Sequence, residues 1–264
     1  MRRRALGEPL SAPGAEIARR VEAAVAAVNR RPRPRPAKAR TIASPARLRR
    51  ALREPWNVRP GSLFSAVLPP GAVPGDHLGA PYDALWGSEW PTRPLWIVAV
   101  DLDVGTRVVF GRPGVPPVRL GQAVQASCAI PGYFEPVGIG TARYVDGGVH
   151  STTNADLLVD QRLDLVVISA PMSTVGGTPE LSPRYAMRQI ARRWVAGEVA
   201  ALRARGVEVV VVQPTPADID VMSGNPMDPA KTPAVVEQVS ATALAHVRDP
   251  RVAPRLGVLR RADT

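Results

Sequence analysis

Apolar positions in the second half of the chain follow two spacings, one typical of strands and one typical of helices. The β-branched runs 164–169 and 207–213 are of the kind buried on both faces of a parallel sheet. Between them an apolar stripe recurs at helical spacing, and we interpret it as core packing: Met187, Ile190, Trp194, Val195, Val199 and Leu202. A last helix is predicted over 233–247. This alternation predicts an α/β fold with three layers, α/β/α, around a mainly parallel central sheet.

Shorter elements are predicted between residues 95 and 146. The apolar run 95–100 and the run 107–110 are separated by a segment with turn chemistry, 103–106, which predicts a β-hairpin. We interpret Asp101 and Asp103 as residues of this turn. A short helix over 120–128 is predicted to stop at Pro131 and Gly132. The strand 143–145 then leads into Asp146-Gly147-Gly148.

The first 94 residues are rich in proline and arginine. The spacing of Ile17, Val21, Val25 and Val28 predicts a helix over 16–28, and a second short helix is predicted over 45–53. Between them, arginine alternates with proline over 31–36, which forbids helix and favours an extended spacer. A stretch punctuated by Pro and Gly then runs to Pro94. We interpret its large apolar residues as a satellite core, with a mobile cap as the alternative: Trp56, Leu63, Phe64, Leu85, Trp86 and Trp90.

The net charge of +11 is a property of the N-terminal segment. Residues 1–60 carry +12 and the rest of the chain carries −1. The arginine-rich composition is what a GC-rich genome would give, so we expect a solvated arm at 30–40 and no specific nucleic-acid binding. Two alternatives stay open: attraction of the arm to anionic lipid surfaces, and a nucleic-acid tether.

Targeting features are sparse. No apolar run approaches the ~20 residues that a membrane-spanning helix needs, and Gly7, Glu8 and Pro9 interrupt any signal-peptide core. The chain has one cysteine, Cys128, which cannot form an intrachain disulfide. We therefore expect a cytoplasmic location, with peripheral contact at an anionic membrane as a further candidate.

The residues that carry chemistry lie between Ala123 and Asp156. Asp146 ends a predicted strand, and Gly147 and Gly148 let the backbone turn sharply, so the carboxylate can be placed in a cleft where it acts as a base. Alone, an Asp-Gly-Gly tripeptide is a common turn.

The wider segment resembles the patatin-like phospholipases over residues 95–172. The resemblance rests on a small-residue helix that ends in Ala-Ile-Pro-Gly (129–132), an aromatic residue before Pro136-Val137, and Tyr-Val-Asp-Gly-Gly-Val (144–149). Weaker similarity covers Leu10-Ser11 and Asn225-Pro-Met-Asp228. In that family a serine in a Gly-x-Ser-x-Gly elbow and the aspartate of the Asp-Gly-Gly motif form a dyad that hydrolyses lipid acyl esters. The resemblance implies that Asp146 is the catalytic base, that Gly147 and Gly148 complete its motif, and that no metal or organic cofactor is needed.

The chain departs from the family pattern in one respect. It contains no Gly-x-Ser-x-Gly and no glycine-rich oxyanion loop, which in relatives precede the aspartate. We therefore expect a patatin-like domain without its nucleophile and its first strands, and an exposed apolar face where these would pack. Residues 1–160 are expected to form the truncated patatin-like domain, and residues 161–264 to complete the same α/β unit.

Other catalytic or metal sites find little support. Ser127, Asp146 and His150 occur in the order of an α/β-hydrolase triad, but Ser127 has no flanking glycines to form a nucleophile elbow. Three histidines and one cysteine give no zinc-ligand spacing. Two functions remain: a serine lipid acyl hydrolase of which this chain holds the aspartate, or an inactive patatin remnant that binds lipid or a protein partner.

Overall fold

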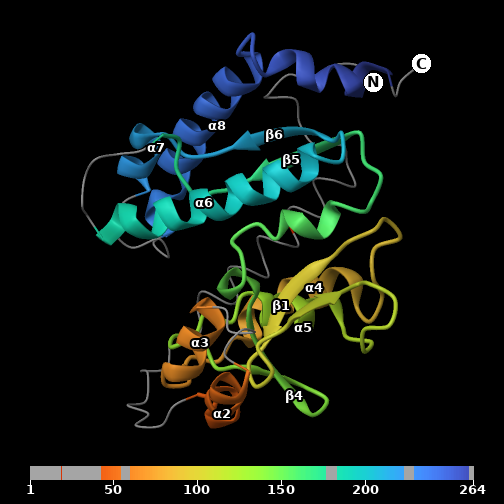
Figure 1. Ribbon diagram of the computed structural model, residues 1–264, viewed down its shortest axis with the longest axis vertical. Helices are drawn as coiled ribbons and strands as arrows, with labels where there is room; N and C mark the ends of the chain where they lie inside the picture. Colours follow the sequence, from red (N-terminus) through yellow and green to blue (C-terminus); the bar gives the residue numbers. More distant parts are fainter. Residues whose placement is uncertain (1–18, 20–42, 55–59, 177–182, 223–228, 262–264) are drawn as a thin grey trace. The chain divides into compact units, whose positions relative to one another are not determined.

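The computed structural model describes residue 19 and residues 43–54, 60–176, 183–222 and 229–261. Within them the chain forms two compact units, one made of the described residues up to 150 and the other of those from 151 onward (Figure 1). Most of the predicted helix 16–28, the arm at 30–40, Trp56 and Asn225–Asp228 lie outside the described residues. The predicted division of one α/β unit after residue 160 stays a prediction.

The first unit combines helices with a four-stranded sheet. Its helices are α2 (Pro45–Arg53), α3 (Pro60–Val67), α4 (Asp76–Trp86) and α5 (Leu120–Ser127). Its strands are β1 (Ile97–Asp101), β2 (Arg107–Phe110), β3 (Val137–Ile139) and β4 (Ala142–Asp146), and the 3-10 helix η2 (Gly147–Val149) follows β4. Helices α2 and α5 and the β1–β2 hairpin confirm the sequence predictions at those positions.

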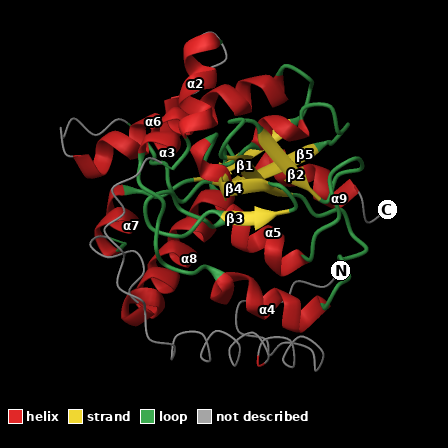
Figure 2. Ribbon diagram, turned by 90° about the horizontal axis from the view of Figure 1, so that it is seen from below, coloured by secondary structure: helices red, strands yellow, loops and turns green. Residues whose placement is uncertain are grey.

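Every pairing in this four-stranded sheet is antiparallel. The strand order is β2-β1-β4-β3, and in Figure 2 β1 and β4 lie next to each other. Short turns join β1 to β2 and β3 to β4, and such connections can only join antiparallel strands. Mixed α/β structure is therefore confirmed, whereas a mainly parallel central sheet is not.

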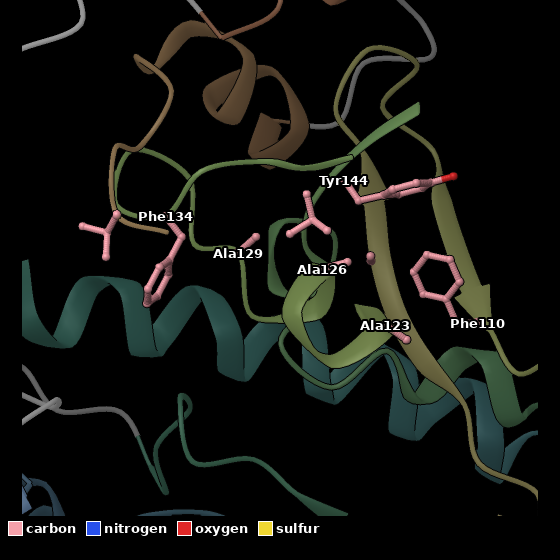
Figure 3. Close-up of a cluster of buried hydrophobic side chains, with 9 residues drawn as sticks. Phe110, Ala123, Ala126, Ala129, Phe134 and Tyr144 are labelled. Atoms are coloured by element: carbon pink, nitrogen blue, oxygen red, sulfur yellow. The ribbon is translucent and has the colours of Figure 1, made fainter. Parts of the chain in front are cut away.

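The core of the first unit lies between α5 and one face of the sheet (Figure 3). The buried side chains Ala123 and Ala126 of α5 face Phe110 and Tyr144 from the strands, whose rings meet edge to face at 5.4 Å. Small residues on α5 let the helix approach the sheet closely. On the opposite side, Val100, Leu102 and Val145 form a second buried cluster with Ala43.

Helices α4 and α5 cross at a pair of glycines. A Cβ on Gly79 would lie 2.2 Å from the carbonyl oxygen of Gly121, and one on Gly121 would lie 2.4 Å from that of Gly79. Asp83 on α4 accepts from the N–H of Gly121 at 3.0 Å and from Arg119 at 2.7 Å, which caps the start of α5. The crossing therefore depends on backbone contact that any side chain at either glycine would block.

The second unit contains a βαβ arrangement. Strands β5 (Leu165–Ser169) and β6 (Glu208–Val212) pair in parallel, as predicted, and α6 (Pro183–Arg203) connects them. Helix α6 lies along the two strands (Figure 1), and Val195, Val199 and Leu202 form a core with Val166 and Val209. The remaining elements are η3 (Ala155–Leu158), α7 (Pro216–Val221), η4 (Pro229–Lys231), α8 (Thr232–Arg248), η5 (Ala253–Gly257) and α9 (Val258–Arg261).

Some predicted core positions are exposed. Met187 is 62% exposed and Ile190 is 38% exposed, so the predicted stripe is buried only from Val195 onward. In the first unit Trp90 packs against the core and donates to the carbonyl of Val118 at 2.7 Å, whereas Phe64 is 65% exposed. The satellite core thus includes Trp90 but not Phe64. None of the described helices is long and apolar enough to cross a bilayer.

Candidate functional site

The Asp-Gly-Gly turn at the end of β4 is the best-defined candidate site. Asp146 is the last residue of β4 and caps η2, because its Oδ1 accepts from the N–H of Gly148 at 2.7 Å. No described residue donates a hydrogen bond to Oδ2 of Asp146. One carboxylate oxygen is therefore fixed and the other remains available as an acceptor.

The glycines of this turn are required by close backbone approach. A Cβ on Gly147 would lie 2.4 Å from the carbonyl oxygen of Val98 in the neighbouring strand β1. A Cβ on Gly148 would lie 3.0 Å from Asp146 Oδ1, within the space that the carboxylate occupies. Helix α3 closes in from another direction, since a Cβ on Gly61 would meet the carbonyl oxygen of Val149 at 2.1 Å. These contacts hold the turn in one conformation.

The structure brings together the two halves of the sequence motif. The N–H of Asp146 donates to the carbonyl of Ala129 at 3.0 Å, so the Ala-Ile-Pro-Gly segment after α5 lies directly beside the Asp-Gly-Gly turn. The next part of that segment is tied to residues 71–73: the N–H of Val73 donates to the carbonyl of Tyr133, and the N–H of Glu135 donates to the carbonyl of Val73. The motif residues quoted from the sequence thus form one hydrogen-bonded structure.

The surroundings of Asp146 favour its neutral form. Burial raises the pKa of this carboxyl, and the hydrogen bond from the Gly148 N–H opposes part of that increase. The pKa of the Cys128 thiol is also raised, chiefly by partial desolvation and secondly by the negative charge of Asp146, although the residue is exposed at the surface. A carboxylate whose pKa is raised above the ordinary aspartate value is a stronger base, and such groups are common at catalytic sites.

Cys128 is a neighbour that the sequence analysis did not connect with the site. The sequence shows it 18 positions before Asp146, at the end of the small-residue helix. The backbone bond from Asp146 to Ala129, the residue after Cys128, is what brings the two together. That bond joins residues distant in the sequence, so only the motif match could have indicated it.

The alternative triad is not assembled. Ser127 is the last residue of α5, and no hydrogen bond joins His150 to the Ser127 hydroxyl or to the Asp146 carboxylate, the two links that a triad requires. Asp101 and Asp103 act in the hairpin turn as predicted: Asp101 Oδ1 accepts from the N–H groups of Asp103 and Val104 at 2.9 and 2.8 Å. Among the described residues no group of three His, Cys, Asp or Glu side chains could hold a metal ion.

The model of the patatin-like phospholipase family matches residues 16–159, more than half of the chain. The chain belongs to this family. The match includes β1 to β4, α5 and the whole Asp-Gly-Gly turn, so the candidate site lies in the patatin-like region. Patatin-like proteins are lipid acyl hydrolases, and this membership indicates a hydrolase of that broad class acting on lipids.

Proposed function

We propose that the protein acts in the hydrolysis of lipid acyl esters through a Ser-Asp dyad, with Asp146 as the base and Gly147 and Gly148 as the residues that shape its turn. The observation that carries the proposal is the Asp146 carboxylate: one oxygen is fixed by the Gly148 N–H, the other is open, and burial raises its pKa. A buried, oriented carboxylate of this kind can accept a proton during nucleophilic attack.

The proposed reaction has two proton transfers through Asp146. The carboxylate takes the proton of a serine hydroxyl as its oxygen attacks the ester carbonyl, and that proton leaves with the alcohol. Asp146 then takes a proton from the water that attacks the acyl-enzyme, and the released serine recovers it as the fatty acid departs. Because the 264 residues contain no Gly-x-Ser-x-Gly, this mechanism needs the serine from a segment outside this sequence.

The first test uses the protein isolated from its native source and a serine-reactive fluorophosphonate. We expect one adduct on a polypeptide heavier than 28.1 kDa, the mass of the 264 residues. An adduct on a polypeptide of 28.1 kDa would contradict the proposal that the nucleophilic serine lies outside these 264 residues. A chain of that mass with no adduct and no esterase activity would instead favour the second candidate, an inactive remnant that binds lipid or a protein partner, for which the missing motif is the supporting observation.

Asp146→Asn tests the base in the same native protein. We expect turnover of a phospholipid or acyl ester to fall about 10⁴-fold or more, since removal of one member of a catalytic dyad or triad costs this much. In the unsubstituted protein the acidic limb of the activity profile should lie above the ordinary aspartate pKa, because Asp146 must be ionised to act as a base. Asp164→Asn, at an exposed aspartate, is the control. Turnover that survives in Asp146→Asn would overturn the assignment.

A further inference from the structure

Helix α2 presents a basic face with an exposed leucine at its edge. Arg49, Arg50 and Arg53 are exposed, and Leu52 at the edge of this face is 84% exposed. At 100° per residue, Leu52, Arg49 and Arg53 are neighbours on the outer side of the helix, opposite the buried Arg47. We call the surface of Arg49, Arg50, Leu52 and Arg53 the α2 basic face.

The charge on this face is largely uncompensated. Arg50 forms an i,i+4 ion pair with Glu54 at 3.4 Å, and no described acidic side chain forms an ion pair with Arg49 or Arg53. The three arginines line a hollow of about 420 Å³ together with Ala46 and Glu54. Arg50 and Arg53 lie in the last turn of α2, where positive charge interacts favourably with the helix dipole. This interaction does not explain why Leu52 is exposed to water beside them.

The helix is held rigidly in place. The Ser44 hydroxyl caps α2 by accepting from the N–H of Arg47 at 3.0 Å and donates to Asp103 at 2.6 Å. Asp103 also accepts from Arg143, whose guanidinium reaches the carbonyl of Ala43 as well. These bonds join the start of α2 to the β1–β2 turn and to β4, so the α2 basic face keeps one orientation on the unit that carries Asp146.

We propose that the α2 basic face docks the protein on the surface of anionic lipid membranes. The arginines complement the negative headgroups and bind their phosphates, and Leu52 enters the boundary between headgroups and acyl chains. The neighbouring helix α3 also exposes apolar side chains, Phe64 at 65% and Val67 at 49%, three residues apart on one side of that helix. A nucleic-acid surface would use the arginines but has no need of the exposed leucine, so the membrane is the occupant that accounts for both.

The experiment is flotation of the full chain with vesicles of phosphatidylcholine alone or with about 30 mol% phosphatidylserine. We expect binding to the anionic vesicles only, weakening as salt rises from about 0.1 M to about 1 M. Arg49→Gln/Arg53→Gln should lower the partition coefficient about 30-fold, which corresponds to about 1 kcal/mol per charge removed. Leu52→Ala should lower it about 10-fold through lost apolar insertion.

Matched variants separate this face from general positive charge. Arg192→Gln/Arg193→Gln removes two exposed arginines of α6, and Arg33→Gln/Arg35→Gln removes two from the N-terminal arm; each should change binding less than about 3-fold if α2 is the docking surface. Leu259→Ala, at an exposed leucine of α9, is the control for Leu52→Ala. Circular dichroism checks that every variant is folded.

Three results would overturn the proposal. The first is absence of salt-sensitive binding to anionic vesicles. The second is a loss as large in either control pair as in the α2 pair. The third is that the Arg49→Gln/Arg53→Gln variant loses binding to a single-stranded oligonucleotide but binds vesicles normally. That result would assign the α2 basic face to nucleic acid. Binding needs no turnover, so Asp146→Asn should leave it unchanged, and its outcome is independent of the proposed hydrolysis.

Discussion

At the scale of single residues, the Asp-Gly-Gly turn has no room for a side chain at either glycine. Gly147 lies against the carbonyl of Val98, and Gly148 lies against the carboxylate of its own neighbour Asp146. From the sequence alone, the two glycines indicated only that the backbone can turn sharply here. The structure adds that the reason at Gly147 is contact with another strand.

Gly147→Ala should lower the free energy of unfolding by about 2–4 kcal/mol, because the new methyl group would meet a backbone oxygen that cannot move aside without distorting β1. Gly138→Ala in β3 is the control, since a Cβ there has no neighbour within 4 Å; its effect should stay within about 0.5 kcal/mol. Denaturant unfolding followed by circular dichroism measures both. Equal effects of the two substitutions would show that Val98 does not constrain the turn.

Asp146→Asn should make the protein more stable at pH 7. Burial raises the pKa of the folded carboxyl, so the folded chain holds this proton more tightly than the unfolded chain does. The free energy of unfolding contributed by this group is therefore highest below the ordinary aspartate pKa and falls as pH rises through the interval up to the raised value. Asparagine keeps an oxygen for the Gly148 N–H and carries no charge.

The extra stability of Asp146→Asn should vanish in acid, below the ordinary aspartate pKa of about 3.9. Thermal melts of both proteins across pH 3 to 8 measure the difference, within the pH range where each refolds on cooling. A stability difference that does not change with pH would show that burial of the charged carboxylate is not its cause.

At the scale of elements, α4 and α5 pack backbone against backbone. Their crossing has a glycine on each helix and a carboxylate, Asp83, that caps the partner helix. Gly79→Ala and Gly121→Ala should each destabilise the protein by about 2–3 kcal/mol, because each methyl group would separate two backbones.

Gly197→Ala on α6 is the matched control for this crossing. A Cβ there meets nothing within 4 Å, and alanine has a helix propensity about 1 kcal/mol better than glycine, so this variant should be more stable than the parent. Urea midpoints rank the three variants. If Gly79→Ala also stabilises the protein, the helices do not cross at the separation described.

Local patterns predicted single elements better than they predicted how these elements pair. Helix α2, strand β2 and the hairpin turn at Asp103 follow directly from capping, alternation and turn residues. Helices α3 and α4 were missed because their prolines indicated a loop. Pro60 begins α3, where its missing N–H has no partner to lose, and Pro81 lies inside α4, where burial of the ring compensates for a lost hydrogen bond.

Pairing direction and burial depend on contacts between distant residues. The sequence predicted parallel pairing correctly for β5 and β6, which a long helix connects, but β1 lies between β2 and β4 through bonds that no local pattern encodes. Met187 has helical spacing and an apolar side chain, yet its side chain is exposed. At the candidate site, Asp146 and its glycines were predicted from the motif, whereas the contacts to Ala129, Val98 and Cys128 required the structure.

At the scale of the whole molecule, each compact unit has its own buried core. The first contains the clusters around Phe110 and Val100, and the second contains the cluster around Leu202 and Val209. Separate cores permit separate local unfolding, because the loss of packing in one leaves the contacts of the other in place.

Leu202→Ala and Leu120→Ala form a matched pair for this property, as both leucines are at most 1% exposed. Each should lower the free energy of unfolding by about 2–5 kcal/mol. Hydrogen exchange followed by mass spectrometry should show faster exchange mainly in β5 and β6 for Leu202→Ala, and mainly in β1 to β4 for Leu120→Ala. Equal acceleration everywhere in both variants would show that the two units unfold as one.

The position of Cys128 gives the molecule a built-in chemical reporter. It is the only cysteine in the sequence and it is exposed, so a reagent can reach it, while partial desolvation and the charge of Asp146 both suppress its thiolate. Its rate of alkylation therefore depends on whether the neighbouring carboxyl carries a proton. A maleimide dye would attach at this one place, so the ionisation of the proposed base can be followed by labelling alone, with no substrate present.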